Sequence, residues 1–186
     1  MLADPYATNV LNKAVHGRLV ADLETYAQDA RIQPEAIWTP LAKMCGKEEI
    51  DYVRRFKFHR SEDTFGLAFI GKAPNVDIDG KMQAIAGALV RNFIRARVMV
   101  MTQLFDAIDE EGIPEMSALL LPNFHSTNAS GAKSSWKIAN ILDVLMHRRS
   151  LGLQTIIYTP DLDALGLDYG SGVRRLIMQN YTRVNV

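Results

Sequence analysis

The chain has 186 residues and carries 21 Lys and Arg side chains against 21 Asp and Glu side chains. This length allows one substantial hydrophobic core, and a composition of 48% hydrophobic and 23% charged residues does not fit a disordered chain. The balanced charge excludes a nucleic-acid partner held by bulk charge, so any basic surface has to be local.

The single cysteine, Cys45, excludes an intrachain disulfide and fits a reducing compartment. No apolar run reaches the length of a membrane span, and the first ten residues lack the basic and apolar regions of a signal peptide. We therefore expect a cytoplasmic protein with no membrane partner.

Residues 1–60 are predicted to form a small helical module. Apolar side chains recur at four-residue steps between positions 9 and 31, which predicts one amphipathic helix over 9–31. Pro34 is tolerated in a first helical turn, so a second helix is expected over 35–45 and a third over 47–58.

The polar stretch 59–64 is the expected linker to a second domain, residues 61–186, in which strands and helices alternate. Strands are expected at 67–70, 98–101, 118–121, 154–158 and 182–186. Helices are expected at 81–95, 103–109, 136–148, 161–165 and 172–178. Such alternation implies right-handed crossovers and a parallel sheet covered on both faces. The expected fold class is therefore α/β, in three αβα layers.

The stretch 65–90 reads as a strand, a polar loop opening at Gly71, and a helix starting near Gly80-Lys81. This order is the context of a phosphate-binding P-loop, in which loop amides and the helix N-terminus hold an anion. Counting back from Gly80-Lys81, Asn75 stands where the motif needs its first glycine, and Met82 stands where it needs a hydroxyl.

Two carboxylates, Asp77 and Asp79, also lie where phosphates would bind, and their charge opposes an anion there. For Lys81 the alternative to a phosphate clamp is an exposed lysine paired with these neighbours. The sequence thus keeps the order of strand, loop and helix typical of a nucleotide site but lacks the residues that bind phosphate and magnesium.

The order of signals from Gly66 to Val186 resembles the AAA+ core of bacterial helicase loaders of the DnaC/DnaI type, and of the related transposition helper ATPase IstB. The segment GLAFIGKAPNVDIDGKMQAIAGALV looks like the Walker A strand and helix, and SALLLPNF looks like the Walker B strand. QTIIYTPDLDAL looks like the sensor 1 strand, and GVRRLIMQNYTRVNV looks like the last helix and strand. The similarity implies a P-loop NTPase-like domain over about two-thirds of the chain.

The departures from this family all fall on catalytic positions. Asn123 stands in place of the Walker B carboxylate, the sensor 1 asparagine falls near Thr159 or Pro160, and the trans-acting arginine falls near Gln179-Asn180. Phosphoryl transfer depends on positioned metal, lysine and arginine. We therefore expect no catalytic residue, no metal and no bound cofactor, with ATP and Mg²⁺ held at a vestigial site as the alternative. Its residues would be Gly71, Asn75, Gly80, Lys81, Met82 and Asn123.

Basic residues of the second domain are candidates for contact with DNA or with another subunit. In the polar segment 125–135, Lys133 with Trp136 and Lys137 would supply phosphate and stacking contacts to a single strand, and His125 would join them. Cations near helix ends are equally explained by the helix dipole. The candidates are Lys133, Trp136, Lys137, Arg148, Arg149, Arg174 and Arg175.

The resemblance implies a helicase loader, encoded by a phage or mobile element, that binds the replicative helicase and helps deliver it to single-stranded DNA without hydrolysing ATP. The N-terminal module would bind the helicase, and the protein could form a homo-oligomer. The helicase-binding candidates are Leu11, Val15, Leu19, Leu23, Arg54 and Arg55. Two alternatives stay open: a DNA-binding regulator or transposition adaptor that uses a helix-turn-helix-like pair at 35–58, and a divergent active ATPase.

Overall fold

The computed structural model describes residues 4–125 and 135–186, with side chains described from residue 140 onward in the second range. Five strands form the sheet: β1 (Gly66–Ile70), β2 (Ala96–Val98), β3 (Ala118–Leu121), β4 (Gln154–Thr159) and β5 (Tyr181–Asn185). The N-terminal part contains α1 (Lys13–Ala21), α2 (Leu23–Ala30), α3 (Glu35–Trp38), η1 (Leu41–Lys43), α4 (Lys47–Arg54) and η2 (Phe56–Glu62). The remaining helices are α5 (Ile78–Arg91), α6 (Met101–Glu110), α7 (Ser135–Ser150), α8 (Leu162–Tyr169) and α9 (Ser171–Asn180).

The five strands are all parallel and lie in the order β2-β3-β4-β1-β5. β3, with the sequence ALLL, is buried at every position, as expected for a strand covered on both faces. β1 lies between β4 and β5, with Gly66 paired to Thr155 and to Tyr181. The predicted α/β fold class with a parallel sheet is confirmed.

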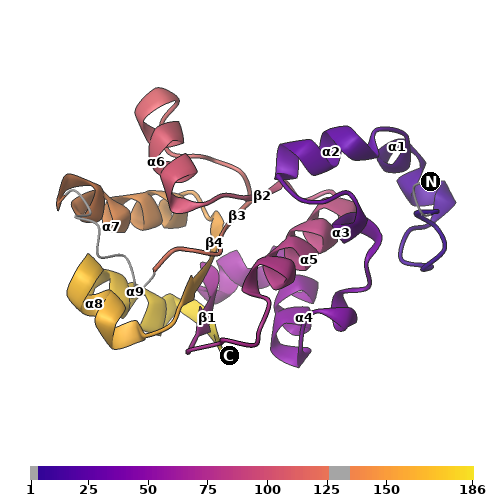
Figure 1. Ribbon diagram of the computed structural model, residues 1–186. Coiled ribbons are helices and arrows are strands. Elements are labelled where there is room, and N and C mark those ends of the chain that lie inside the picture. Colours follow the sequence, from indigo (N-terminus) through magenta and orange to yellow (C-terminus); the bar gives the residue numbers. More distant parts are fainter. Residues whose placement is uncertain (1–3, 126–134) are drawn as a thin grey trace.

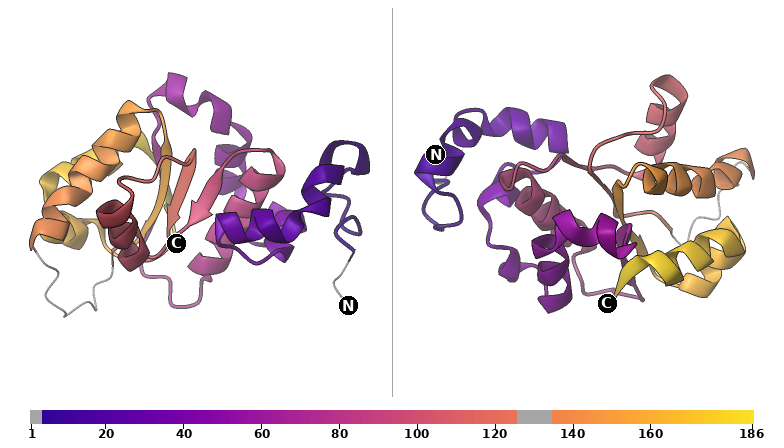
Figure 2. Two further views of the ribbon diagram at one scale, coloured as in Figure 1. Left: turned by 90° about the horizontal axis from the view of Figure 1, so that it is seen from above. Right: turned by 180° about the vertical axis from the view of Figure 1, so that it is seen from behind.

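The helices form two layers because right-handed crossovers in opposite directions place them on opposite faces of the sheet. The step from β1 to β2 runs one way across the sheet and carries α5, whereas the later steps run the other way and carry α6 to α9. Figure 1 shows α5 on one side of the sheet and α6 to α9 on the other, and Figure 2 shows the same layers from above. Each layer encloses its own hydrophobic cluster.

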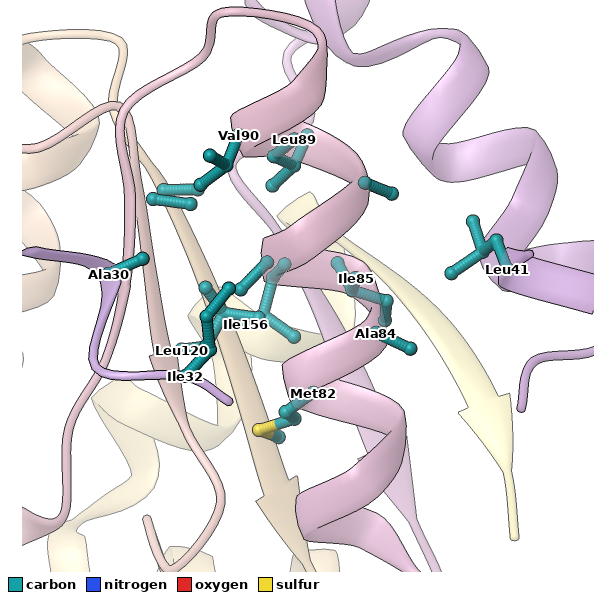
Figure 3. Packing of buried hydrophobic residues seen from close by; sticks show 14 of the residues in the cluster. Ala30, Ile32, Leu41, Met82, Ala84, Ile85, Leu89, Val90, Leu120 and Ile156 are labelled. Atoms are coloured by element: carbon teal, nitrogen blue, oxygen red, sulfur yellow. The ribbon is translucent and has the colours of Figure 1, made fainter. Parts of the chain in front are cut away.

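The N-terminal helices cover the outer side of α5. α2, α3 and α4 all pack against this helix and share one hydrophobic cluster with it. Figure 3 shows Met82 on α5 near Leu120 and Ile156 of the sheet, while Leu41 approaches α5 from the N-terminal segment. At Gly87 a Cβ atom would lie 2.2 Å from the carbonyl oxygen of Ala36, so only glycine allows α3 to approach this closely.

The N-terminal helices are shorter than expected. The single helix predicted over 9–31 is two helices that meet at Asp22. The helix predicted over 35–45 ends at Trp38, because Pro40 offers no amide hydrogen and favours an extended Thr39, with ψ of 128°. The first helix of the helix-turn-helix-like pair over 35–58 is therefore shortened to the four residues of α3, which η1 follows.

In the stretch 59–64, predicted as a linker, residues 60–63 are exposed and His59 is buried. η2 continues to Glu62, and Asp63 follows in the left-handed conformation with φ of 54°. His59 is buried, stacks on Tyr52 at a centroid distance of 4.3 Å, and hydrogen-bonds to the Tyr52 carbonyl oxygen at 2.8 Å. The domain boundary near residue 60 stays a prediction.

In the sheet region the predicted elements exist and some of their ends move. β2 starts two residues earlier than expected, at Ala96, and α5 starts at Ile78, three residues before Lys81. α8 is longer than expected and reaches Tyr169, because Gly170 with φ of 96° ends it. Within the described residues, no helix has the length and apolarity needed to cross a membrane.

Candidate functional site

The candidate site lies at the carboxyl ends of β1, β3 and β4, where ligands bind in open α/β sheets. The loop 71–77 follows β1, Asn123 and His125 follow β3, and Thr159 ends β4. The sheet therefore brings the predicted Walker A, Walker B and sensor 1 positions to one edge of the molecule. Their side-chain contacts determine what the edge can bind.

The N-terminus of α5 is occupied by a carboxylate of the chain itself. Asp77 is the N-cap, and its Oδ1 accepts a hydrogen bond from the Gly80 amide at 2.8 Å. A P-loop offers amides of this kind to phosphate oxygens. Because α5 begins at Ile78, Gly80 and Lys81 lie within its first turn rather than at the end of the loop. In this helix the Gly80-Lys81 pair is displaced from the loop into the first turn, and the carboxylate of Asp77 repels a phosphate.

Lys81 points toward α4 of the N-terminal segment. Its Nζ lies 2.7 Å from Oε1 of Glu49, a side chain that is only 2% exposed, and 5.9 Å from the centre of the Phe69 ring. The Sγ of Cys45 also contacts the Lys81 carbonyl oxygen at 3.9 Å. Burial is the largest influence on this thiol and raises its pKa to about 12. The charge of Lys81 acts to lower this pKa, and the charge of Glu49 acts to raise it. The lysine is thus neutralised by a carboxylate of the same chain.

The other vestigial positions have structural roles or face solvent. Met82 is fully buried in the core beneath α5, so its position cannot hold a metal ligand, and Asn75 is exposed in the loop. Gly71 adopts φ of 131°, and a Cβ atom there would lie 2.3 Å from the carbonyl oxygen of Val186. Glycine is therefore required at this position by the backbone and by the packing of β5.

Asn123, at the Walker B position, acts as a cap for α6. Its Oδ1 accepts a hydrogen bond from the amide of Met101 at 2.9 Å, which satisfies one of the free amides at the start of that helix. The amide of Val100 is bound in turn by Oε1 of Gln103 at 3.3 Å. Asn123 therefore has a structural role at the start of α6.

A polar network that the sequence did not reveal is centred on the buried His125 and joins the ends of β3 and β4. Nδ1 of His125 lies 2.9 Å from Oγ1 of Thr159, and Nε2 lies 2.8 Å from Oδ2 of Asp168 on α8. Thr159 donates to the Asp161 carbonyl oxygen at 2.9 Å, so its oxygen is the acceptor for His125. His125 is fully buried, and the expected contact between this residue and DNA is wrong.

Asp161 begins α8 in the manner of Asp77 on α5. Its carboxylate accepts hydrogen bonds from the amides of Ala164 and Asp163, and these bonds lower the pKa of Asp161, with smaller contributions from Lys72 and His125. Two helix N-termini that face this edge are thus capped by aspartates. The edge offers carboxylates and a buried histidine where an ATPase needs free amides, a magnesium-binding hydroxyl and a catalytic acid. Within the described residues, no group of His, Cys, Asp or Glu side chains is arranged to hold a metal ion.

The basic candidates of the second domain differ in their burial and in their ion pairs. Arg148 is 0% exposed, so the expected surface contact is wrong for this residue. Arg149 pairs with Asp63 at 3.2 Å, Arg174 pairs with Asp163 at 2.8 Å, and Arg175 is exposed. Lys133 lies outside the described residues, and so do the side chains of Trp136 and Lys137 at the start of α7.

Arg148 instead holds together the amino ends of β3 and β4. Its Nε donates to Thr155 Oγ1 at 3.0 Å, and its terminal nitrogens donate to carbonyl oxygens. These acceptors are the carbonyl oxygens of Pro114, Met116 and Gln154. Burial lowers the pKa of the guanidinium to about 10. An arginine in the last turn of a helix is usually solvent-exposed, so the local sequence around Arg148 does not predict that it is buried and binds the strand ends.

The helicase-binding candidates also differ in exposure. Leu11 and Leu19 are buried in the core, and Leu23 is half-buried against it, so these leucines do not form an exposed stripe. Val15 is 59% exposed on α1. The exposed Arg54 lies 3.8 Å from Asp51, and Arg55 contacts Glu62.

This chain is similar to a solved structure of a DNA replication initiation factor. The two align with a TM-score of 0.59 and 12% sequence identity over 83% of this chain. At this identity the likeness shows a shared fold. The match covers 50% of the other chain, so this chain spans about half the length of that structure. No protein-family model and no curated protein sequence matches the chain.

Proposed function

We propose that this protein is a replication accessory protein that binds a partner through a P-loop NTPase-like scaffold and does not turn over ATP. The observation that supports it most is the ion pair between Lys81 and Glu49, at 2.7 Å. It places a buried carboxylate of α4 on the lysine that a P-loop needs for phosphate. The likeness in fold to a DNA replication initiation factor supports the replication context.

Within this function, the activity we favour is that of a helicase loader. Its N-terminal helices would bind the replicative helicase, and the αβα domain would contact single-stranded DNA or a second subunit. Val15 is an exposed large hydrophobic residue of α1, and Arg54 and Arg55 are exposed at the end of α4. Without hydrolysis, release of the helicase would follow from competition by DNA or by primer synthesis.

The first experiment tests nucleotide binding. Titration calorimetry with ATP and Mg²⁺, together with a phosphate-release assay with and without single-stranded DNA, should show neither binding nor turnover. Metal-dependent phosphate release that Lys81→Met abolishes would contradict the proposal and favour a divergent ATPase.

The second experiment tests the partner. The tagged protein should capture the replicative helicase of its source cell, and Val15→Asp should reduce this capture. The matched control is Leu167→Asp, which changes a residue that is 88% exposed on α8, on the opposite side of the sheet. Equal capture by the wild type and both variants would remove α1 from the interface, and no capture by the wild type would end the loader assignment.

A further inference from the structure

Phe93 is a strained and exposed aromatic residue directly after α5. Its backbone has φ of 59°, a conformation that is rare for a bulky side chain. The amide of Phe93 donates to Val90 O at 2.9 Å and the amide of Ile94 to Leu89 O at 3.0 Å, which is the C-cap geometry that normally carries glycine at this position. Its side chain is nevertheless 62% exposed. Strain of this kind without burial in return points to a functional ring.

The ring of Phe93 is held in place from one side. The imidazole of His16 stacks against it at a centroid distance of 5.9 Å and an interplanar angle of 14°. His16 is itself fixed, because Nδ1 accepts the Asn12 amide at 2.8 Å and Nε2 hydrogen-bonds to Arg91 O at 3.1 Å. The pair forms an ordered aromatic platform that extends from the end of α5 into solvent.

A groove beside the platform contains a second aromatic ring and two arginines. A cavity of about 470 Å³ is lined by Tyr26, Phe93, Arg95 and Arg97, and it lies where α2 meets the edge strand β2. Figure 1 shows α2 reaching this edge of the sheet. Nε of Arg97 donates to the Asp29 carbonyl oxygen at 2.8 Å, which fixes that side chain. Among the side chains that the structure describes, Arg95 forms no salt bridge.

The charges around the groove restrict where an anion can lie. Arg95 and Arg97 also line an adjoining cavity of about 580 Å³, whose lining includes Glu111 and Glu115, whereas neither glutamate lines the first cavity. Glu115 lies 3.5 Å from Nε2 of His147. These carboxylates repel a phosphodiester, so the favourable position for one is between the two arginines and the platform. Asp29 is the acidic residue in the lining of the first cavity.

From this geometry we infer that the groove of Tyr26, Phe93, Arg95 and Arg97 binds an unpaired segment of single-stranded DNA. A base stacks on Phe93, and its phosphate lies against the two arginines. Aromatic rings next to a basic groove are the recurrent means of holding single strands without reading their sequence. The site is on the edge of the sheet away from the strand ends described above. It uses none of the basic residues predicted from the sequence.

Fluorescence anisotropy with a labelled 12-nucleotide oligo-dT tests the inference. Phe93→Gly removes the ring and supplies the residue that the backbone favours, so the variant should be at least as stable as the wild type while its affinity falls about 5- to 100-fold. Phe93→Trp should retain binding. Arg95→Gln should weaken binding and reduce the slope of log K against log salt by about one.

The matched control is Phe58→Ala, because Phe58 on η2 is also 62% exposed and lies in no part of the groove. This variant should bind the oligonucleotide as the wild type does. Wild-type affinity in Phe93→Gly, or no binding by the wild type, overturns the inference. So does a loss of helicase capture in Phe93→Gly with unchanged oligonucleotide affinity, because the groove would then bind protein. When the helicase capture is carried out after nuclease treatment of the extract, it does not depend on DNA binding, so the proposed function stands or fails separately.

Discussion

Breaking the pair between Glu49 and Lys81 should cost far more stability than breaking a surface pair of the same length. The Nζ–Oε1 distance is 2.7 Å, and the two side chains are 2% and 16% exposed. Removing one partner of a buried pair leaves the other charge uncompensated and costs about 3–5 kcal/mol. Lys81 retains some contact with water, so for Glu49→Gln we expect the lower value, about 3 kcal/mol.

Urea unfolding followed by circular dichroism measures this cost. With a slope of about 2 kcal/mol per molar urea, a loss of about 3 kcal/mol lowers the midpoint by about 1.5 M. The double variant Glu49→Leu with Lys81→Met should recover most of the loss, because two apolar side chains replace the whole pair.

The control for this experiment is Asp163→Asn, which breaks the exposed pair with Arg174 at 2.8 Å and should cost less than about 1 kcal/mol. If Glu49→Gln and Asp163→Asn lower the midpoint equally, the pair is not desolvated. In that case the interpretation of Lys81 as a neutralised residue is refuted.

Three further predictions concern buried polar groups. Arg148→Met leaves the carbonyl oxygens of Met116 and Gln154 without their donor, so we expect a loss of about 3–5 kcal/mol in urea unfolding, and Arg148→Lys should not restore it because lysine cannot reach all the acceptors. Burial lowers the pKa of His59 below its ordinary 6.5, so between the two pKa values the unfolded chain binds a proton that the folded chain does not. The free energy of unfolding should have its full value above pH 6.5 and decline as the pH falls toward the lowered pKa. His59→Gln should flatten this dependence. Burial raises the pKa of the Cys45 thiol to about 12, so Ellman's reagent should modify it only after unfolding by urea, and rapid modification of the native protein would contradict its buried position.

Much of the sheet could be predicted because parallel strands buried on both faces leave continuous apolar runs. Ala118–Leu121 is such a run, and the structure places it in the interior of the sheet. The helix ends were harder to predict, because they depend on caps and on proline. Asp77 starts α5 before the Gly80-Lys81 pair that the motif comparison selected, and Pro40 interrupts the second helix.

The sequence predicted which groups of a nucleotide site are missing, but it did not predict the contacts that the remaining residues make. Met82 and Asn123 show in the sequence that a hydroxyl and a carboxylate are missing from their motif positions. The partner of Lys81 comes from a helix 32 residues earlier, and no periodicity links the two. Phe93 fell within a predicted helix over 81–95, where its left-handed backbone could not be anticipated. Long-range contacts and single backbone outliers of this kind require coordinates.

The close crossing of α3 over α5 at Gly87 has a use in recognising distant relatives. A methyl group at this position would meet the Ala36 carbonyl oxygen at 2.2 Å, so a larger residue excludes the same arrangement of the N-terminal segment. When overall identity is too low to align two chains, this one position in the helix after the first strand remains informative. A small residue there is compatible with a chain that folds back over its own scaffold, and a large one indicates that this side of the helix is left for another protein or for solvent.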